Sequence, residues 1–288
     1  MISKKTILII LIFLNIVSWS FVYDLTSFNN LEVCFFDVGQ GDSILIKTRD
    51  KQILIDGGPN SYIISKLSKK MPIFDKSIDL VVLTHPHSDH LNGLINVFDK
   101  FKVNDFLSTG EIFESKNFNL LQDLISKEES KNYIAKKGLR ITISKDQYID
   151  VLYPFKSLNN QILSDEEAND SSVILKLSSF NDTMLFTGDA SFKTESELVE
   201  RGIDIQSDIL KVGHHGSKYS TTDYFLNAVL PHLAVISVGE DNRYNHPAQE
   251  TLDRLEKYKI KVVRTDKNGD ICLTQKKTKQ FSLSSQME

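Results

Sequence analysis

The sequence predicts a mixed α/β domain in which two sheets pack together and helices cover their outer faces. Short apolar segments bounded by turn residues occur in both halves of the chain, and segments with helical spacing separate them. The expected strands are residues 31–37, 43–48, 52–56, 78–84, 141–143, 148–153, 172–178, 183–187, 209–212, 233–238, 261–265 and 270–274. The expected helices are residues 62–70, 91–101, 118–138 (one helix or a pair), 192–201, 222–229 and 249–257. Strand clusters in both halves, with helices between them, favour two packed sheets.

Length and charge limit the functional classes. The 288 residues suit one large α/β domain or two small ones. A net charge of −4 does not indicate non-specific nucleic-acid binding, although this net charge is compatible with a local basic patch. Lys211, Lys218 and Arg243 are interpreted either as such a local rim or as ordinary solvated charges.

The N-terminal residues 1–23 form a hydrophobic segment. Lys4 and Lys5 precede an uncharged, Ile- and Leu-rich run over residues 6–22, close to the minimum of ~17 residues that spans a hydrocarbon core. The segment is interpreted as a membrane anchor or as a signal peptide with Ser18-x-Ser20 as a poor cleavage site. Residues 24–30 are expected to be a linker, and residues 31–288 a hydrolase domain that is either anchored outside the cytoplasm or secreted.

The two cysteines, Cys34 and Cys272, lie in the first and last expected strands of the domain. No C-x-x-C pair exists, which argues against a thiolate zinc site. Two buried free thiols are expected, with a disulfide as the alternative if the domain faces an oxidising space.

A dense histidine motif follows the buried strand 78–84. It reads Thr84-His85-Pro86-His87-Ser88-Asp89-His90 and precedes an expected helix. His85 and His87 are two residues apart, so in an extended segment their side chains point the same way. Imidazole and carboxylate ligands suit divalent metals such as zinc, and the cluster predicts one metal ion or two adjacent ions.

At this point the chain resembles the metallo-β-lactamase superfamily, and most closely its ComEC-like branch, which forms the soluble domain of bacterial DNA-uptake channels. The resemblance covers about residues 31–275. Besides the histidine motif, it rests on six segments that occur in family order: Phe36-Asp37-Val38-Gly39-Gln40-Gly41-Asp42-Ser43, Leu54-Ile55-Asp56-Gly57-Gly58, Asn169-Asp170-Ser171-Ser172, Leu185-Phe186-Thr187-Gly188-Asp189, Lys211-Val212-Gly213-His214-His215-Gly216-Ser217 and Asn242-x-Tyr244-x-His246-Pro247.

The resemblance implies a role for each matching residue. The expected metal ligands are His85, His87, Asp89, His90, Asp189 as the bridging aspartate, and His214 or His215. The residues expected to bind substrate are Ser217, Asn242, Tyr244 and His246, and those expected to take part in catalysis are Asp89 and His246. Asp56 is expected to orient a metal-bound histidine, whereas Asp37 and Asp42 are either supports of the ligands or purely structural.

One departure from the superfamily pattern concerns the first metal. Many members carry a further histidine ligand between the histidine motif and the bridging aspartate, but no histidine lies between His90 and His214 here. Asn169 occupies the corresponding region, as in the ComEC-like branch, and is counted among the residues that support the ligands. Two divalent ions, Zn²⁺ or Mn²⁺, are expected, one of them weakly held.

The resemblance points to phosphodiester hydrolysis, with DNA or a nucleotide as substrate. A bound divalent cation lowers the pKa of water from ~15.7 towards ~7, which would supply the nucleophile. Three alternatives stay open. True β-lactamase activity is the least favoured of them, since the match is to the other branch. An ester, lactone or thioester hydrolase would use the same nucleophile. A non-catalytic accessory protein for DNA uptake or surface binding would need no nucleophile.

Overall fold

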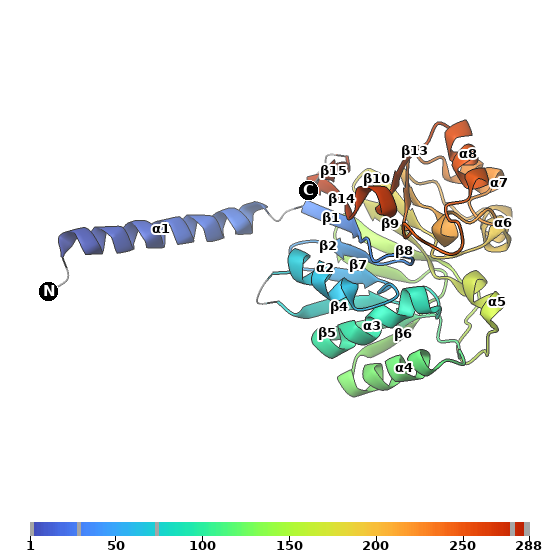
Figure 1. The fold of residues 1–288 in the computed structure, drawn as a ribbon, viewed down its shortest axis with the longest axis horizontal. Coiled ribbons are helices and arrows are strands. Elements are labelled where there is room, and N and C mark those ends of the chain that lie inside the picture. Colours follow the sequence, from blue (N-terminus) through green and yellow to red (C-terminus); the bar gives the residue numbers. More distant parts are fainter. Residues whose placement is uncertain (1–2, 28–29, 73–74, 277–279, 285–288) are drawn as a thin grey trace.

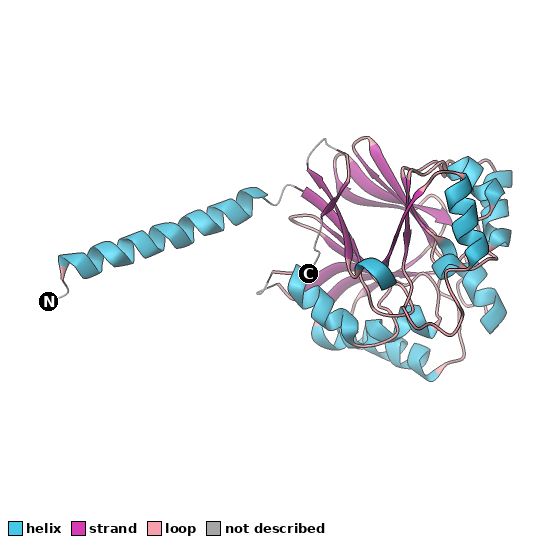
Figure 2. Cartoon of the chain, turned by 45° about the horizontal axis from the view of Figure 1, so that its top comes forward, coloured by secondary structure: helices cyan, strands magenta, loops and turns pink. Residues whose placement is uncertain are grey.

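The computed structural model describes residues 3–27, 30–72, 75–276 and 280–284, and in this part of the chain two sheets face each other with helices outside (Figures 1 and 2). This arrangement confirms the expected two-sheet α/β fold. The first sheet has the strand order β15-β14-β1-β2-β3-β4-β5-β6, and the second has the order β13-β12-β11-β10-β9-β8-β7.

The first sheet combines antiparallel and parallel pairing. Its strands are β1 (Asn30–Phe35), β2 (Ile44–Lys47), β3 (Gln52–Ile55), β4 (Ser77–Val82), β5 (Lys102–Ser108), β6 (Lys131–Ile134), β14 (Ile271–Lys276) and β15 (Ser282–Ser284). Strands β3 to β6 run parallel, while β15, β14, β1, β2 and β3 pair antiparallel with their neighbours. The parallel part places the ends of β3 and β4 side by side.

The second sheet has the same mixed construction. Its strands are β7 (Arg140–Ser144), β8 (Gln147–Tyr153), β9 (Ile174–Ser179), β10 (Asp182–Phe186), β11 (Ile209–Lys211), β12 (Leu233–Ile236) and β13 (Lys261–Arg264). Strands β7 to β10 pair antiparallel, and β10 to β13 run parallel. The carboxyl ends of β10, β11 and β12 therefore lie next to one another.

Three apolar clusters hold the four layers together. One lies between the sheets, and alternate residues of β1 show why: Leu31, Val33 and Phe35 face this centre, whereas Cys34 belongs to the cluster under the helices of the first sheet. A third cluster lies between the second sheet and its helices. The helices are α2 (Tyr62–Lys70), α3 (Ser88–Lys100), α4 (Lys116–Glu128), α5 (Asp165–Ala168), η1 (Asn169–Ser171), α6 (Phe192–Glu200), η2 (Gly213–Gly216), α7 (Asp223–Val229), α8 (Gln249–Lys257) and α9 (Thr265–Asn268).

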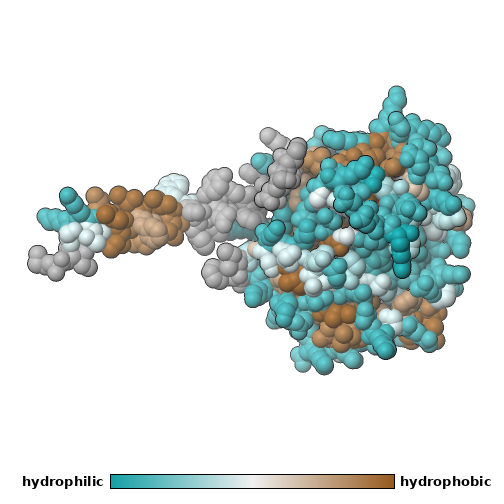
Figure 3. Space-filling view, viewed as in Figure 1, coloured by the Kyte–Doolittle hydropathy of each residue, from teal (hydrophilic) through white to brown (hydrophobic). Residues whose placement is uncertain are grey.

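The N-terminal segment forms a helix, α1 (Lys4–Ser27), that projects away from the two sheets (Figure 1). Apolar side chains between Ile7 and Trp19 are exposed, and they form a brown band in Figure 3. Among the described residues, no helix combines the length and apolarity needed to cross a membrane. A linker is expected at residues 24–30, but residues 24–27 continue helix α1, because they contain no glycine or proline to end it. Strand β1 already begins at Asn30. Residues 28 and 29 lie outside the described residues.

Two expectations about the domain are wrong. Residues 118–138 do not form a helix pair, because α4 ends at Glu128 and the chain then joins the first sheet as β6. The cysteines are not free thiols. Cys34 and Cys272 lie directly opposite each other on β1 and β14, their Cα atoms 4.1 Å apart, and form a disulfide. This cross-strand proximity depends on sheet register, which a separation of 238 residues conceals.

Candidate metal centre

The candidate site is built where parallel strands of the two sheets end. Segments that follow β3 and β4 of the first sheet meet segments that follow β10, β11 and β12 of the second. Loops at the carboxyl ends of parallel strands commonly carry the functional side chains of α/β folds. This common edge explains how motifs more than a hundred residues apart come together.

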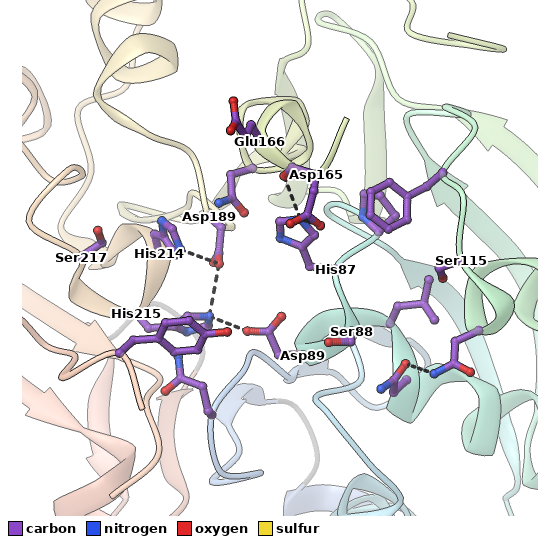
Figure 4. Close-up of a pocket in the computed structure, with 18 of the residues that line it drawn as sticks. His87, Ser88, Asp89, Ser115, Asp165, Glu166, Asp189, His214, His215 and Ser217 are labelled. Carbon is purple, nitrogen blue, oxygen red and sulfur yellow. Dashed lines mark hydrogen bonds and ion pairs between the residues drawn. The ribbon is translucent and has the colours of Figure 1, made fainter. Parts of the chain in front are cut away.

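Four predicted ligands converge, and we call them the converged group: Asp89, His90, Asp189 and His215. One ligand atom from each lies within 4.8 Å of all the others. Asp189 Oδ2 is 3.3 Å from His90 Nε2 and 3.2 Å from His215 Nε2, and Asp89 Oδ2 is 3.3 Å from His215 Nε2. Figure 4 shows Asp89, His215 and Asp189 facing one another. Of the two adjacent histidines, the structure therefore brings His215 into this group.

The converged group is held by further hydrogen bonds. Asp56 Oδ2 lies 2.8 Å from His90 Nδ1 and also accepts a hydrogen bond from the Thr84 hydroxyl at 2.7 Å. The Ser237 carbonyl lies 2.8 Å from His215 Nδ1. Each imidazole is thus bound through Nδ1 and directs Nε2 at the centre, the arrangement that orients metal-ligating histidines. Asp56 has the orienting position expected from the sequence.

Behind the converged group lies a fully buried cation, Lys211. Its ammonium contacts the Asp42 carboxylate, donates a hydrogen bond to the Gly188 carbonyl at 2.8 Å, and lies 3.7 Å from Asp189 Oδ1. Asp42 Oδ1 in turn lies 3.5 Å from His215 Nδ1. Lys211 therefore belongs neither to a basic rim nor to the solvated surface, and the structure places Asp42 among the supports of the ligands.

Backbone conformation directs the second-sheet ligands. His214 and His215 both have positive φ, 47° and 54°, which is uncommon for residues with a side chain and marks a constrained turn. This turn sends His215 inwards, while the His214 side chain stays 30% exposed with Nε2 3.9 Å from Asp189 Oδ2. On the first-sheet side, a Cβ at Gly41 would lie 2.1 Å from the Asp89 carbonyl oxygen, so only glycine permits this close approach.

The remaining predicted ligands lie outside the converged group, and we call them, with Asn169, the open group: His85, His87, His214 and Asn169. His85 is buried, with Nδ1 3.1 Å from the Thr84 hydroxyl. The His87 ring turns to α5, where Nε2 lies 3.1 Å from the carbonyl and 3.3 Å from the carboxylate of Asp165 (Figure 4). The structure therefore places His87 outside the converged group.

The donor atoms fit a divalent cation. Nε2 of His85, His90 and His215, Oδ1 of Asp189 and Oδ1 of Asn169 are buried and have no hydrogen-bond partner among the described residues. Burial opposes charge on His215, yet Asp189 and the neighbouring carboxylates raise its pKa to about 10. Burial likewise opposes charge on His90, whose pKa Asp189 and Asp56 raise well above its usual range. The group therefore favours positive charge at its centre, and its nitrogen and oxygen ligands suit Zn²⁺ or Mn²⁺.

His246 lies next to this centre on the loop after β12. Its ring is 5.7 Å from that of His214 and stacks on Tyr244 at 5.8 Å. Burial, together with the charges of His214 and His215, lowers the pKa of His246 to about 4. The ring is therefore neutral at pH 7, and a neutral imidazole can donate a hydrogen bond through one of its nitrogens.

Other predicted residues have structural roles in this arrangement. Asn242, expected to bind substrate, bonds instead to its own loop, donating to the carbonyls of Gly239 and His246 and accepting from the His246 amide. Its amide is thereby occupied in shaping the loop that carries His246. Asp37 accepts a hydrogen bond from the Gly39 amide and so stabilises the first turn, away from the ligands.

An open cavity of about 790 Å³ lies over the ligands, and Figure 4 shows part of its wall. Asp89, Asp189 and His215 line it, and so do Ser115, Asp165 and three residues for which the sequence predicts substrate contacts, Ser217, Tyr244 and His246. Sequence reasoning missed Asp165, Glu166, Phe113 and Tyr219 in this wall. None of these four belongs to a recognisable ligand motif, so only the fold reveals them.

Comparisons with known proteins agree with this geometry. The model of the family described as "Metallo-beta-lactamase superfamily" matches residues 36–157. The chain is 33% identical over 264 residues to ComE operon protein 3 of Bacillus subtilis, covering 83% of this chain and 32% of that protein. It is 29% identical over 243 residues to competence protein ComA of Neisseria gonorrhoeae, covering 84% of this chain and 32% of the relative. The chain thus spans about a third of the length of these relatives.

Solved structures share the fold at low sequence identity. The metallo-β-lactamase fold protein YhfI from Bacillus subtilis aligns with a TM-score of 0.56 and 12% identity, covering 86% of this chain and 100% of that one. CmlA, a diiron β-hydroxylase from Streptomyces venezuelae, aligns with a TM-score of 0.50 and 14% identity, covering 81% of this chain and 52% of its own. These likenesses concern the architecture alone.

Proposed function

We propose that this chain, which belongs to the metallo-β-lactamase superfamily, is a metal-dependent phosphodiesterase acting on nucleic acid or nucleotides. Members of the superfamily are generally metal-dependent hydrolases. The observation that carries the proposal is the converged group, because three of its four ligands, Asp89, Asp189 and His215, line an open cavity. Such a site combines a place for a cation with room for a substrate beside it.

The residues of the chain have distinct tasks in this proposal. A divalent cation would be held by Asp89, His90, Asp189 and His215, where it supplies positive charge that polarises a phosphoryl oxygen and lowers the pKa of water. Asp56 keeps the His90 ring oriented through the bond at Nδ1. The neutral His246 ring can donate a hydrogen bond to a phosphate oxygen from the cavity wall.

The names of the relatives support nucleic acid as the substrate class. Competence protein ComA carries a name that refers to competence, and a further relative, at 27% identity over 248 residues, is recombination protein 2 of Haemophilus influenzae. Competence and recombination both involve DNA, so a phosphodiester is the favoured electrophile over an ester, lactone or thioester.

We further propose that the domain works outside the cytoplasm, either anchored through its N-terminal segment or secreted after cleavage. The exposed apolar residues of α1 and the two lysines that precede them support this placement. The Cys34–Cys272 disulfide supports it independently, because disulfides persist mainly in oxidising compartments. Labelling of introduced surface cysteines in intact and in lysed cells tests the orientation.

The activity is tested with the full chain purified in detergent and freed of metal. Mn²⁺ or Zn²⁺ is added back, and hydrolysis of bis(p-nitrophenyl) phosphate and of single- and double-stranded DNA is followed beside an Asp89→Ala, His90→Ala double variant. We expect cleavage that depends on the added metal and disappears in the variant. Absence of cleavage with metal demonstrably bound would overturn the phosphodiesterase proposal and favour ester or lactone hydrolysis, or a binding role.

A further inference from the structure

The wall of the cavity over the metal ligands carries exposed aromatic and charged side chains. Tyr219, Arg243 and Tyr244 line it, and so do the exposed side chains of Lys116, Asp165 and Glu166. The cations in this wall attract a polyanion.

Two tyrosines that line the cavity are exposed. Tyr219 is 60% exposed and Tyr244 is 50% exposed, and each lines the cavity. They come from different loops: Tyr219 follows η2, and Tyr244 lies between β12 and α8. Neither ring contributes to one of the three apolar clusters, so packing does not explain their presence.

Each tyrosine is paired with a cation from the preceding residue. Lys218 Nζ lies 5.1 Å from the centre of the Tyr219 ring, and the Arg243 guanidinium carbon lies 4.9 Å from that of Tyr244. Lys218 and Arg243 are exposed, and no described carboxylate lies within ion-pair distance of either. Arg243 also donates a hydrogen bond to the Tyr244 hydroxyl at 2.7 Å, which leaves its other N–H groups and the Lys218 ammonium available to a ligand, each beside an exposed ring.

A chain of ring contacts connects Tyr244 to the ligands. The Tyr244 ring stacks on His246 with an interplanar angle of 19°, and the His246 ring contacts that of His214, whose Nε2 is 3.9 Å from Asp189 Oδ2. A base held near Tyr244 would thus have its backbone within reach of the converged group. Aromatic rings interleaved with cations are the usual means of binding single-stranded nucleic acid, since the rings stack on bases and the cations neutralise phosphates.

We infer that Lys218, Tyr219, Arg243 and Tyr244 form a binding subsite for single-stranded polynucleotide beside the metal centre. The inference rests on the proposed phosphodiesterase function and names its substrate class. A base pair within a duplex hides both faces of each base in the helical stack, so stacking on these tyrosines selects unpaired strands. The subsite therefore distinguishes single strands from duplexes without recognising a particular base sequence.

The test measures binding separately from cleavage. The full chain in detergent, without added metal and with a chelator, is titrated into a fluorescent oligothymidylate, an abasic oligonucleotide of the same length, an oligouridylate and a duplex, with anisotropy as the readout. We expect the oligothymidylate to bind roughly 5- to 150-fold more tightly than the abasic strand, the range for one stacked base. The oligouridylate shows whether the sugar matters.

Variants identify the residues responsible. A Tyr219→Ala, Tyr244→Ala double variant should bind the oligothymidylate as weakly as the abasic strand, while the Tyr219→Phe, Tyr244→Phe variant retains the difference. Tyr224→Ala is the matched control, since Tyr224 is 51% exposed on α7 and does not line the cavity. Thermal unfolding of each variant confirms that it is folded.

The outcomes separate this inference from the proposed function. Equal affinity of the wild type for the oligothymidylate and the abasic strand, tighter binding of the duplex, or wild-type binding by a folded double alanine variant would each overturn the subsite. Hydrolysis of bis(p-nitrophenyl) phosphate by the wild type would still stand in those cases. Conversely, tyrosine-dependent strand binding without metal-dependent hydrolysis would overturn the phosphodiesterase and leave the subsite in place.

Discussion

The converged group and the open group contain residues from the same motif, yet the fold treats them differently. His90 and His215 each have Nδ1 bound by a buried partner and Nε2 directed at Asp189. In the open group, His87 bonds to Asp165 on a short helix, and Asn169 Oδ1 is buried without a hydrogen-bond partner among the described residues. Ligand residues alone therefore do not define a metal site, because the groups that orient them decide how tightly an ion is held.

The largest effect should come from exchanging the two neighbouring histidines for alanine separately. His215→Ala removes a ligand from the converged group, so we expect loss of the tightly bound metal and a fall in hydrolysis of roughly 10³-fold or more. His214→Ala should reduce hydrolysis by about tenfold, but the tightly bound metal should stay in place. The reason is that the affinity for this ion depends mainly on the ligands that other groups hold in position, such as His90 and His215. Metal content after dialysis and hydrolysis rates measure both effects, and equal losses in the two variants would contradict the distinction.

The next effect concerns the support of His90. Asp56→Asn keeps the volume of the side chain but removes the negative charge beside His90 Nδ1, so we expect the affinity for the tight metal to fall about 10- to 100-fold. Competition with a metal-binding dye measures the dissociation constant. Ser171→Ala, a buried position whose hydroxyl bonds only to the Ala168 carbonyl in the described hydrogen bonds, serves as the control. An unchanged affinity in Asp56→Asn would show that the orientation of His90 does not depend on this carboxylate.

A smaller effect is expected from completing the open group. Asn169 Oδ1 is buried without a hydrogen-bond partner among the described residues, and Asn169 lines the cavity with His87 and His214. Asn169→His adds an imidazole there, so binding of a second ion should tighten by about tenfold while the first is unchanged. Isothermal titration with Mn²⁺ gives both affinities. A gain at the tight site instead would mean that Asn169 belongs with the converged group.

The smallest effect concerns the loop beneath His87. Phe113 of this loop packs edge-on against the His87 ring, and burial of the nearby Glu111 raises the pKa of its carboxyl to about 7. The folded protein therefore binds this proton more tightly than the unfolded chain, and the stability it contributes is complete below pH 4.5 and is lost as the pH rises towards 7.

Glu111→Gln should remove this pH dependence. At pH 8 we expect stabilisation by about 1 kcal/mol, less than the full cost of ionisation because the amide also lacks a partner. Thermal unfolding of the wild type and the variant between pH 5 and pH 8 measures the difference. Two parallel pH profiles would show that Glu111 does not ionise in this range.

Much of the site could be predicted from the sequence, because its ligands are short motifs that directly follow apolar strands. The convergence of Asp89, His90, Asp189 and His215 follows from strand ends that meet at one edge, and strand ends are marked in the sequence by Gly188 and by the polar residues after each apolar run. The order of the strands within each sheet did not follow from the sequence in the same way.

The features that sequence reasoning missed depend on tertiary placement. Lys211 ends an apolar strand, where a long cation normally reaches solvent, and only the position of Asp42 behind the ligands explains its burial. The turn of His87 towards Asp165 depends on how α5 approaches α3, and no local pattern encodes it. The pairing of the two cysteines likewise depends on the register between β1 and β14.

That cysteine pair also sets the covalent topology of the domain. The bond from Cys34 to Cys272 closes the chain into a ring, and every ligand of both groups lies within it. A single peptide-bond cut by a protease in any loop of the ring therefore opens the ring without releasing a fragment. Under non-reducing conditions a nicked molecule stays in one covalent piece, and its two sheets can remain assembled around the metal ligands.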